Sequence, residues 1–503
     1  MDGSAVRRGS VLRTGWCRNA VRSALVLLGS TVAVVPAVVP AAAQADGSGQ
    51  PGSSAAALDD EAYAAVVGLY EFDDGARVVI FDMVDQLREH QLVALEPGTG
   101  RARTLYPASD TVFEAGSAWF VAEPREYRLR FGRGDGGVIE RVVRESPVEA
   151  EADRAEASAG GGSADRPASP AADRAADSPE RSTGRRVPLR EREVEFDGDG
   201  VRLSGSVILP EGEGPHPGVV IVHGSGPLTR RGPRYMGQLF ADRGVAALVY
   251  DKRGTGGSTG EWQGASHEAL TGDARAAVEA LRRQPEVDAG RVGLYGSSEG
   301  GYVVPVVASA DPEVAFLVCR VCPALTQRRV APHQQADALR NNGFDEGEID
   351  DAIAFHRRFL DYAVDGAGRD ALEAAFERWR DEPWMERYGF RRVPPPDAPY
   401  WSVIRGVMTV DPSEHYARLS IPVLVVLGER DGRIPVDEHR AAFAAARDAA
   451  GNDDFSIEVM SDATHGLLVM RTGPDGETLP FDGFAPEFHD LVVDWVAERA
   501  VRP

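Results

Sequence analysis

The stretch that decides the fold is VGLYGSSEGG, residues 292–301. It opens with an apolar run typical of a buried strand, and Gly296-Ser297-Ser298-Glu299-Gly300 then matches the pattern G-x-S-x-G. A helix is expected to follow over Gly301–Ser309. A sharp strand-to-helix turn leaves no room for Cβ atoms beside the central serine, which explains the glycines. We therefore predict that Ser298 is a nucleophile, exposed at a helix N-terminus where the dipole favours developing negative charge.

The surrounding sequence alternates strands and helices. A hairpin, Arg190–Phe196 with Val201–Leu209, precedes runs that are apolar throughout, and an amphipathic helix is expected over His267–Arg283. The apolar runs are Gly218–Val222, Ala246–Tyr250, Val292–Tyr295, Val314–Val321 and Pro422–Leu427. Continuous apolar runs, as opposed to alternating ones, indicate strands buried on both faces of a mostly parallel sheet.

A serine nucleophile on such a sheet needs an acid and a histidine downstream, in that chain order. After the strand Pro422–Leu427 comes the Gly-rich turn Gly428–Pro435, and a carboxylate at a strand's carboxyl end can orient an imidazole. Asp431 is the predicted acid. Glu429 and Asp437 are fallback carboxylates, and Asp437 looks more like a residue at the start of a helix.

The predicted base is His465, which follows the last strand, Ser456–Met460, in a loop where it can reach Ser298. His439 and His489 lie in helix-like stretches and are interpreted as ordinary surface or helix residues.

Backbone N–H donors for an oxyanion are expected from two segments. One donor is that of Glu299, directly after the nucleophile, and the other comes from Ser225 or Gly224, in the loop after the strand Gly218–Val222. His223, which precedes this loop, is interpreted as structural.

With these motifs in order, residues 188–503 resemble the serine α/β-hydrolase superfamily, near its esterase, dienelactone-hydrolase-like and prolyl-oligopeptidase-like branches. The Asp-x-Arg-Gly-x-Gly-x-Ser stretch at Asp251–Ser258 adds to the likeness, and there we expect a glycine loop tied by Asp251 and Arg253 without a catalytic role. The resemblance implies an α/β-hydrolase sheet. An aspartate nucleophile, as in epoxide hydrolases, is excluded by Ser298. Prolyl oligopeptidases carry a large propeller domain ahead of their hydrolase domain, and the residues that precede residue 188 in this chain are too few to form one.

Further modules are expected around this region. About a hundred residues separate two sheet strands, so 324–415 is interpreted as a helical cap. Its aromatic residues suggest an apolar pocket lining, and several of them are expected to form the cap's own core. Short β-like runs in 58–148 predict a small all-β module. Residues 149–187 contain no large apolar side chain before Val187 and are interpreted as a disordered linker. We expect this linker to be too polar to clamp the two units together.

The N-terminus and the composition bear on location. Residues 1–45 combine five arginines, an apolar run and a small-residue end, the pattern of a signal peptide. No second membrane span is found, so the protein is expected to be secreted or periplasmic. The net charge of −23 and the single lysine, Lys252, argue against nucleic-acid binding. Cys319 and Cys322 have no second Cys/His pair at zinc spacing and are interpreted as buried thiols.

These features together predict an exported serine hydrolase that cleaves carboxylic esters of small molecules and needs no metal or other cofactor. A serine peptidase or acyl-peptide hydrolase on the same triad is the alternative enzyme. The non-enzyme alternative is an inactive hydrolase-fold protein that binds a partner.

Overall fold

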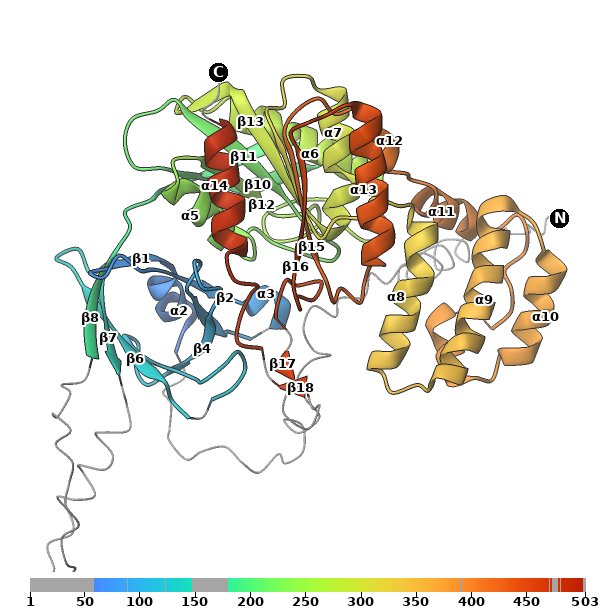
Figure 1. Ribbon diagram of the computed structural model, residues 1–503, viewed down its shortest axis with the longest axis horizontal. Coiled ribbons are helices and arrows are strands. Elements are labelled where there is room, and N and C mark those ends of the chain that lie inside the picture. The colour runs from blue at the N-terminus through green and yellow to red at the C-terminus, as the bar shows by residue number, and fades with distance from the viewer. Residues whose placement is uncertain are drawn as a thin grey trace, which may run out of the picture.

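The computed structural model describes residues 58–500, apart from 88, 123, 147–179, 390, 470, 473–477 and 480. The predicted signal peptide, 1–45, and most of the predicted linker lie outside the described residues. The chain forms an N-terminal barrel, a central sheet covered by helices and a helical cap (Figure 1).

The central sheet has eight strands in the order β16-β15-β14-β13-β11-β12-β10-β9. The six strands from β11 to β16 pair in parallel, and β10 pairs antiparallel with β9 and β12. The strands are β9 (Arg190–Asp197), β10 (Arg202–Leu209), β11 (His216–Val222), β12 (Ala246–Tyr250), β13 (Val287–Ser297), β14 (Leu317–Arg320), β15 (Val423–Gly428) and β16 (Phe455–Met460). This is the mostly parallel α/β-hydrolase sheet that the sequence predicts.

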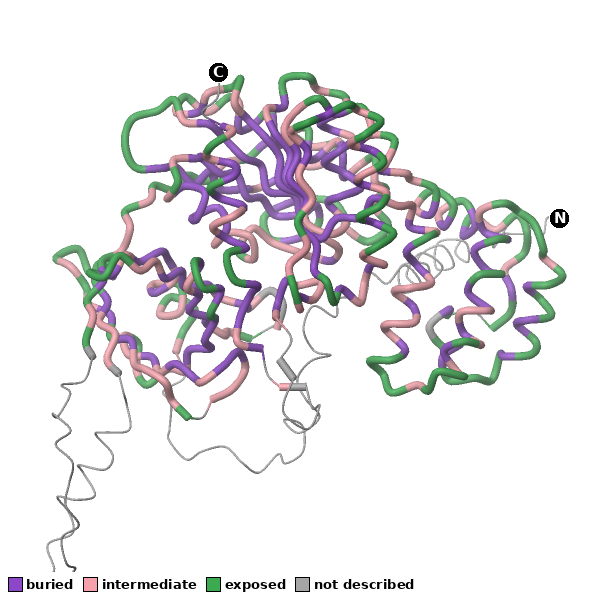
Figure 2. The backbone as a smooth tube through the Cα atoms, viewed as in Figure 1, coloured by how far each residue is buried: buried purple, intermediate pink, exposed green. Residues whose placement is uncertain are grey.

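The central strands β11 to β15 are buried along most of their length (Figure 2). Both faces of the sheet are covered there, because successive side chains of these strands enter different cores. Val220 and Val222 face the core made with one group of helices, whereas Val219 and Ile221 face the other group. The first group is α6 (His267–Arg282), α7 (Val304–Ala310), α12 (Ser413–Tyr416) and α13 (Val436–Ala450). The second group is α5 (Arg234–Asp242) and α14 (Phe488–Ala500). Continuous apolar strands are therefore needed.

The N-terminal module is a closed antiparallel barrel of eight strands. They are β1 (Gly68–Phe72), β2 (Arg77–Asp82), β3 (Leu92–Leu95), β4 (Ala102–Pro107), β5 (Val112–Ala115), β6 (Tyr127–Arg133), β7 (Ile139–Ser146) and β8 (Glu180–Arg186). The short helices α2 (Asp60–Val66) and α3 (Val84–Leu87) flank the first strands.

Strand β8 corrects the predicted linker, which was assigned to 149–187. Residues 180–186 pair with both β1 and β7 and close the barrel. The segment lacks large apolar side chains, but its backbone forms the ladder and Arg186 caps the barrel end through the carbonyls of Ala65, Val67 and Ile139. Backbone pairing does not depend on apolar composition, which is why composition alone missed the strand.

The expectation that nothing clamps the barrel to the hydrolase region is also wrong. Barrel residues on β1, β2, β3 and β4 share one apolar core with α5, α14 and the sheet. Phe81 stacks on Tyr235 with ring centroids 4.8 Å apart, and Arg77 Nε donates to Asp242 Oδ2 at 3.0 Å. The two modules are therefore packed against each other.

The cap lies between β14 and β15 and has its own core. It comprises α8 (Gln327–Asn341), α9 (Glu346–Asp365), α10 (Arg369–Trp379), the 3-10 helix η3 (Pro383–Tyr388) and α11 (Pro399–Met408). The seven aromatic residues expected to line a pocket all belong to this core and are buried: Phe355, Phe359, Tyr362, Trp379, Trp384, Tyr388 and Trp401. These rings therefore fill the core of the cap, as expected for several of them, and an apolar pocket lining stays a prediction.

Candidate active site

Ser298 lies at the turn between β13 and the 3-10 helix η2 (Ser298–Tyr302). Its φ of +52° is in the left-handed region, which a residue with a Cβ rarely adopts. The glycines on either side allow the turn: a Cβ at Gly296 would lie 2.7 Å from Val304, and one at Gly300 would lie 3.1 Å from the His223 carbonyl oxygen. The local sequence thus permits a strained turn that presents the Ser298 side chain.

The structure brings the three predicted triad residues together. His465 Nε2 lies 2.9 Å from Ser298 Oγ, and His465 Nδ1 lies 2.7 Å from Asp431 Oδ2. They come from the carboxyl ends of β13, β15 and β16, which meet at one edge of the sheet because these strands are parallel. This arrangement can move a proton from a serine to an imidazole beside a carboxylate.

Asp431 is fixed by its own turn. Its side chain is fully buried, and Oδ1 accepts hydrogen bonds from the backbone N–H groups of Arg433 and Ile434. Oδ2 is thereby directed to His465. The two fallback carboxylates do not hydrogen-bond to His465 in the described structure. Glu429 accepts a hydrogen bond from the Asp462 N–H, and the Asp437 side chain is exposed in the first turn of α13.

The other two downstream histidines are helical but not on the surface, which corrects part of their interpretation. His439 and His489 are completely buried in α13 and α14. Burial, aided by the positive charge of Arg320, lowers the pKa of His489 to about 3. Neither ring hydrogen-bonds to Ser298 in the described structure.

Arg320 is a site residue that the sequence reasoning missed. Its Nη1 donates to Ser297 Oγ at 3.0 Å and its Nη2 to the Gly466 carbonyl at 2.5 Å, so one guanidinium joins the residue before Ser298 to the residue after His465. A signal was present, because Arg320 interrupts the apolar run Val314–Cys322. A charge within a buried strand requires partners.

The two predicted oxyanion segments also lie side by side. A Cβ at Gly224 would lie 3.4 Å from Ser298 Cβ, which places the loop after β11 against Ser298. Lys252 joins the two segments: its Nζ donates to the Gly224 carbonyl at 3.0 Å and to Glu299 Oε2 at 2.6 Å. Burial is the largest single influence and raises the pKa of Glu299, but the charge and hydrogen bond of Lys252 together with the neighbouring His267 outweigh it and leave that pKa below its usual value.

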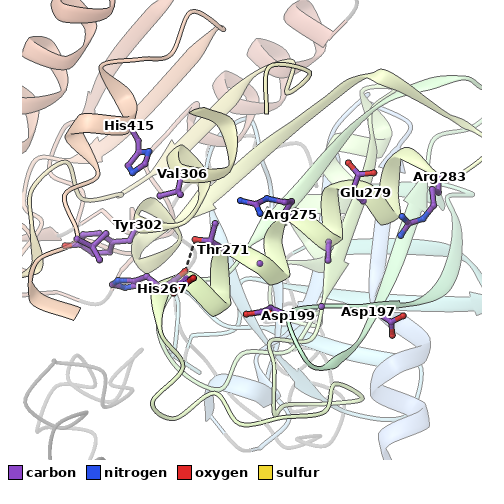
Figure 3. Close-up of a pocket in the computed structure, with 15 residues that line it drawn as sticks. Asp197, Asp199, His267, Thr271, Arg275, Glu279, Arg283, Tyr302, Val306 and His415 are labelled. Atoms are coloured by element: carbon purple, nitrogen blue, oxygen red, sulfur yellow. Dashed lines mark hydrogen bonds between the residues drawn. The ribbon is translucent and has the colours of Figure 1, made fainter. Parts of the chain in front are cut away.

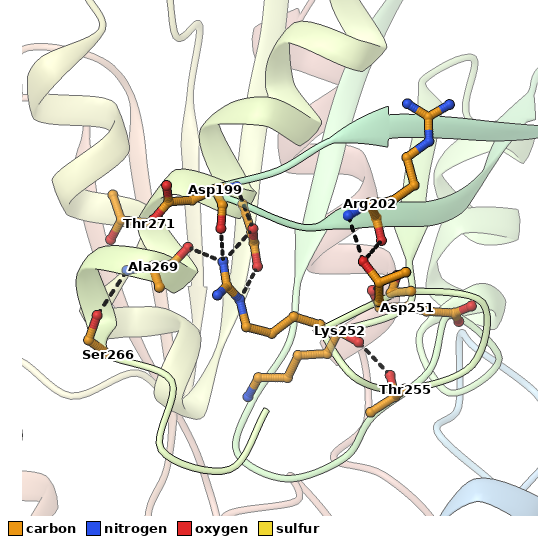
Figure 4. Close-up of polar contacts among 12 residues, drawn as sticks. Asp199, Arg202, Asp251, Lys252, Thr255, Ser266, Ala269 and Thr271 are labelled. Carbon is orange, nitrogen blue, oxygen red and sulfur yellow. Dashed lines mark hydrogen bonds and ion pairs between the residues drawn. The ribbon is translucent and has the colours of Figure 1, made fainter. Parts of the chain in front are cut away.

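The loop that carries Lys252 is held as the sequence predicts (Figure 4). Asp251 accepts from the backbone N–H groups of Arg230 and Gly257, and Arg253 forms a two-pronged pair with Asp273. His223 is structural as well, since burial lowers its pKa to about 3 and its ring packs edge-on against Tyr250. It therefore stays neutral.

A cavity of about 780 Å³ lies beside α6 (Figure 3). His267, Tyr302 and His415 line one end, and Arg275, Glu279 and Arg283 extend along the helix. None of the residues that line it belongs to the triad. The cavity therefore does not define the reaction site.

Among the described residues no group of three His, Cys, Asp or Glu side chains could hold a metal ion. No helix there combines the length and the apolar character needed to cross a bilayer. Cys319 and Cys322 are buried free thiols, as expected.

Parts of the chain are similar in sequence to known proteins. Residues 199–466 match the family described as X-Pro dipeptidyl-peptidase (S15 family). Esterase EstD of Thermotoga maritima is 23% identical over 314 residues, covering 60% of this chain and 66% of that protein. Thiohydrolase aneE of Aspergillus aculeatus is 32% identical over 152 residues, or 29% of this chain. The quorum-quenching protein AidA of Acinetobacter baumannii is 31% identical over 138 residues, or 27% of this chain.

The chain spans about half the length of the last two relatives, 47% and 45% respectively. Among solved structures, an esterase of Pyrococcus furiosus superposes with a TM-score of 0.39 and 16% identity, covering 62% of this chain and 89% of that one. Est1E of Butyrivibrio proteoclasticus gives a TM-score of 0.38 and 16% identity, covering 61% and 96%.

Proposed function

The chain belongs to the X-Pro dipeptidyl-peptidase (S15) family of serine hydrolases with the α/β-hydrolase fold, and we propose that it hydrolyses carboxylic esters through Ser298, His465 and Asp431. The observation that carries the proposal is the unbroken chain of hydrogen bonds from Ser298 Oγ through His465 to Asp431, with Ser298 at a left-handed turn.

The reaction takes two steps. His465 Nε2 accepts the Ser298 proton while Oγ attacks the ester carbonyl, and the collapse of the tetrahedral intermediate releases the alcohol with that proton. His465 then takes a proton from water as the water oxygen attacks the acyl-enzyme. When this second intermediate collapses, the bond to Ser298 Oγ breaks, Oγ takes the proton back from His465 and the acid is released. Asp431 keeps Nδ1 protonated and stabilises the imidazolium in both steps.

The oxyanion of each intermediate is held by backbone N–H groups. That of Glu299 is one donor, and Ser225 or Gly224 supplies the other. The closeness of Gly224 to Ser298 and the link through Lys252 support this assignment. No step calls for a metal or another cofactor.

Esters are proposed ahead of peptides on chemical grounds. An alkoxide leaves readily, whereas an amide nitrogen must be protonated as it departs, so a triad able to cleave amides also cleaves activated esters. Similarity to esterase EstD supports an ester substrate. The family match and the similarity to the uncharacterized peptidase YuxL of Bacillus subtilis support the alternative, a serine peptidase or acyl-peptide hydrolase.

We further propose that the enzyme acts outside the cytoplasm on small-molecule esters. The support is the signal-like composition of residues 1–45. Detection of the mature chain, beginning near residue 46, in a secreted or periplasmic fraction tests this location.

The decisive experiment combines a substrate panel with a covalent probe. Chromogenic esters of graded acyl length are assayed beside aminoacyl-anilides and X-Pro-anilides, and a fluorophosphonate is used to label the protein. We expect ester turnover and labelling at Ser298, both abolished in Ser298→Ala, with Ser297→Ala as the matched control that keeps labelling. Turnover confined to anilides would favour the peptidase. An unlabelled, folded wild-type protein would instead favour the binding protein.

A further inference from the structure

The loop after His465 folds back on itself before α14 begins. Its first stretch, Leu467–Val469, is bonded to a second stretch, Phe481–Ala485: Val469 N–H donates to the Gly483 carbonyl at 3.0 Å and Ala485 N–H to the Leu467 carbonyl at 2.7 Å. Leu468 and Phe484 form an isolated antiparallel bridge. The second stretch therefore holds the backbone that begins two residues after His465.

The barrel grips that second stretch through backbone hydrogen bonds. Ala102 N–H donates to the Asp482 carbonyl at 2.9 Å, and Phe484 N–H donates to the Gly100 carbonyl at 2.8 Å. Trp119 N–H donates to the Phe481 carbonyl at 3.0 Å. The loop is thus joined to β4, to the turn before it and to the segment after β5.

Two glycines make this contact possible. A Cβ at Gly483 would lie 1.9 Å from the Gly100 carbonyl oxygen, and a Cβ at Gly100 would lie 2.4 Å from the Phe484 carbonyl oxygen. Gly100 also has a φ of +73°. The two backbones are therefore in contact, with no space for a side chain between them.

Arg103 adds a side-chain clamp at the same place. It is buried on β4, and its Nη1 lies 2.9 Å from the Asp482 carbonyl oxygen and 2.8 Å from Asp482 Oδ1. Its Nε donates to Glu126 Oε2 at 2.5 Å, which fixes the guanidinium within the barrel. Trp119 covers the contact with its ring edge-on to Phe484, at 5.3 Å between centroids.

We propose that the barrel is a positioning element of the active site: it holds Phe481–Ala485, which in turn holds the backbone after His465. Arg103 is the principal positioning residue, and it acts through the loop without touching substrate. The proposal rests on the proposed function, since it assigns the barrel a role in the triad's geometry. Small shifts of a catalytic group cost rate more than they cost binding.

The test compares two arginines of the same barrel in the full-length protein. Arg103→Gln removes the clamp on the loop, whereas Arg77→Gln removes a barrel contact with Asp242 of α5 and leaves the loop untouched. For a short soluble ester we expect Arg103→Gln to lower kcat by roughly tenfold or more, with KM within about twofold of wild type. Arg77→Gln should change neither, and Arg103→Lys should restore part of kcat.

A second readout does not depend on turnover. Hydrogen exchange of peptides covering Leu467–Val469 and Phe481–Ala485 should be faster in Arg103→Gln than in Arg77→Gln. Asp482→Ala, which removes only the outer half of the clamp, should shift both readouts in the same direction and serves if Arg103→Gln does not fold.

The outcomes separate the two proposals. If wild-type protein is not labelled at Ser298 by the fluorophosphonate, the proposed function fails. If wild type is labelled and the Arg103→Gln and Asp482→Ala variants match Arg77→Gln in kcat and in exchange, the positioning role of the barrel is overturned.

Discussion

Asp431 sits in a turn that spends one carboxylate oxygen on two backbone N–H groups and leaves the other for His465. The aspartate side chain therefore has one orientation, and its hydrogen bond to Nδ1 fixes the orientation of the His465 ring. An amide at this position could still accept the backbone hydrogen bonds, but it would present a neutral group to Nδ1.

We accordingly expect Asp431→Asn to bind ester about as well as wild type and to lower kcat about ten-thousand-fold, as in other serine-histidine-aspartate triads. Steady-state kinetics with the best ester of the panel measures this. Asp437→Asn is the control, because that side chain is exposed on α13. A larger loss of kcat in Asp437→Asn than in Asp431→Asn would show that Asp437, and not Asp431, is the acid of the triad.

Lys252 is the single lysine of the chain, and its ammonium joins both oxyanion segments. Lys252→Met should lower kcat by roughly tenfold or more, since the Gly224 loop and the turn at Glu299 lose their common donor. It should also destabilise the fold by about 3 kcal/mol, because the Glu299 carboxylate loses its buried partner.

Glu299→Gln separates these two effects. In the double variant Lys252→Met/Glu299→Gln the buried charge is gone, so thermal stability should recover, but Gly224 still lacks its donor and kcat should stay low. Recovery of kcat together with stability would show that Lys252 serves only the fold.

At the scale of elements, α14 carries a histidine in an aromatic surrounding. His489 is fully buried, and its ring packs edge-on against Phe484 and Phe488. Burial, with the Arg320 charge adding to it, lowers its pKa to about 3, and the pKa of His223 is lowered to about 3 as well, mainly by burial. In the unfolded chain both rings titrate near pH 6.5.

Between about pH 6.5 and pH 3 these rings thus bind more protons in the unfolded chain than in the folded one. The free energy of unfolding therefore has its full value above pH 6.5 and falls as the pH drops through this window. Each ring should lower the free energy of unfolding by about 2 kcal/mol at pH 5.

His489→Phe removes one of these titrations and should reduce the loss of Tm between pH 8 and pH 5. Thermal melts at both pH values measure it. Phe488→Leu on the same helix is the control, expected to lower Tm equally at both. An unchanged pH dependence in His489→Phe would contradict the assignment.

At the scale of the whole molecule, the segment 149–179 joins two strands of one barrel, since β7 precedes it and β8 follows it. A cut there leaves β1–β7 on one fragment and β8 with the hydrolase region on the other, and the pairing of β8 with β1 and β7 still joins the two fragments. The barrel also shares an apolar core with α5, α14 and the sheet.

Limited trypsin cleavage at Arg154 or Arg174, neither of which precedes a proline, should therefore give two fragments that stay together. We expect them to co-elute in gel filtration, to separate in denaturant and to retain ester turnover. The uncut protein carried through the same incubation is the control. Dissociation of the fragments under native conditions would mean that the barrel contacts are too weak to hold the modules.

The amino-acid sequence determined the sheet and brought the proposed triad within reach, because these features have local signatures. Apolar runs identify strands buried on both faces, and parallel strands place their carboxyl ends at one edge. The residues that follow β13, β15 and β16 must then converge, which is how Ser298, Asp431 and His465 could be chosen in advance.

The closure of the barrel and its place against the hydrolase region were decided only by the tertiary structure. Strand β8 is recognised by backbone pairing to β1 and β7, which any composition can form, and the clamp of Arg103 on Asp482 joins residues far apart in the chain. The sequence contained one local signal of this packing, because Val78–Phe81 and Leu92–Leu95 are apolar throughout. In the structure one face of each strand meets the barrel interior and the other face meets the hydrolase core. Runs buried on both faces imply a second covering layer, but only the folded chain shows that this layer is the enzyme's own catalytic module.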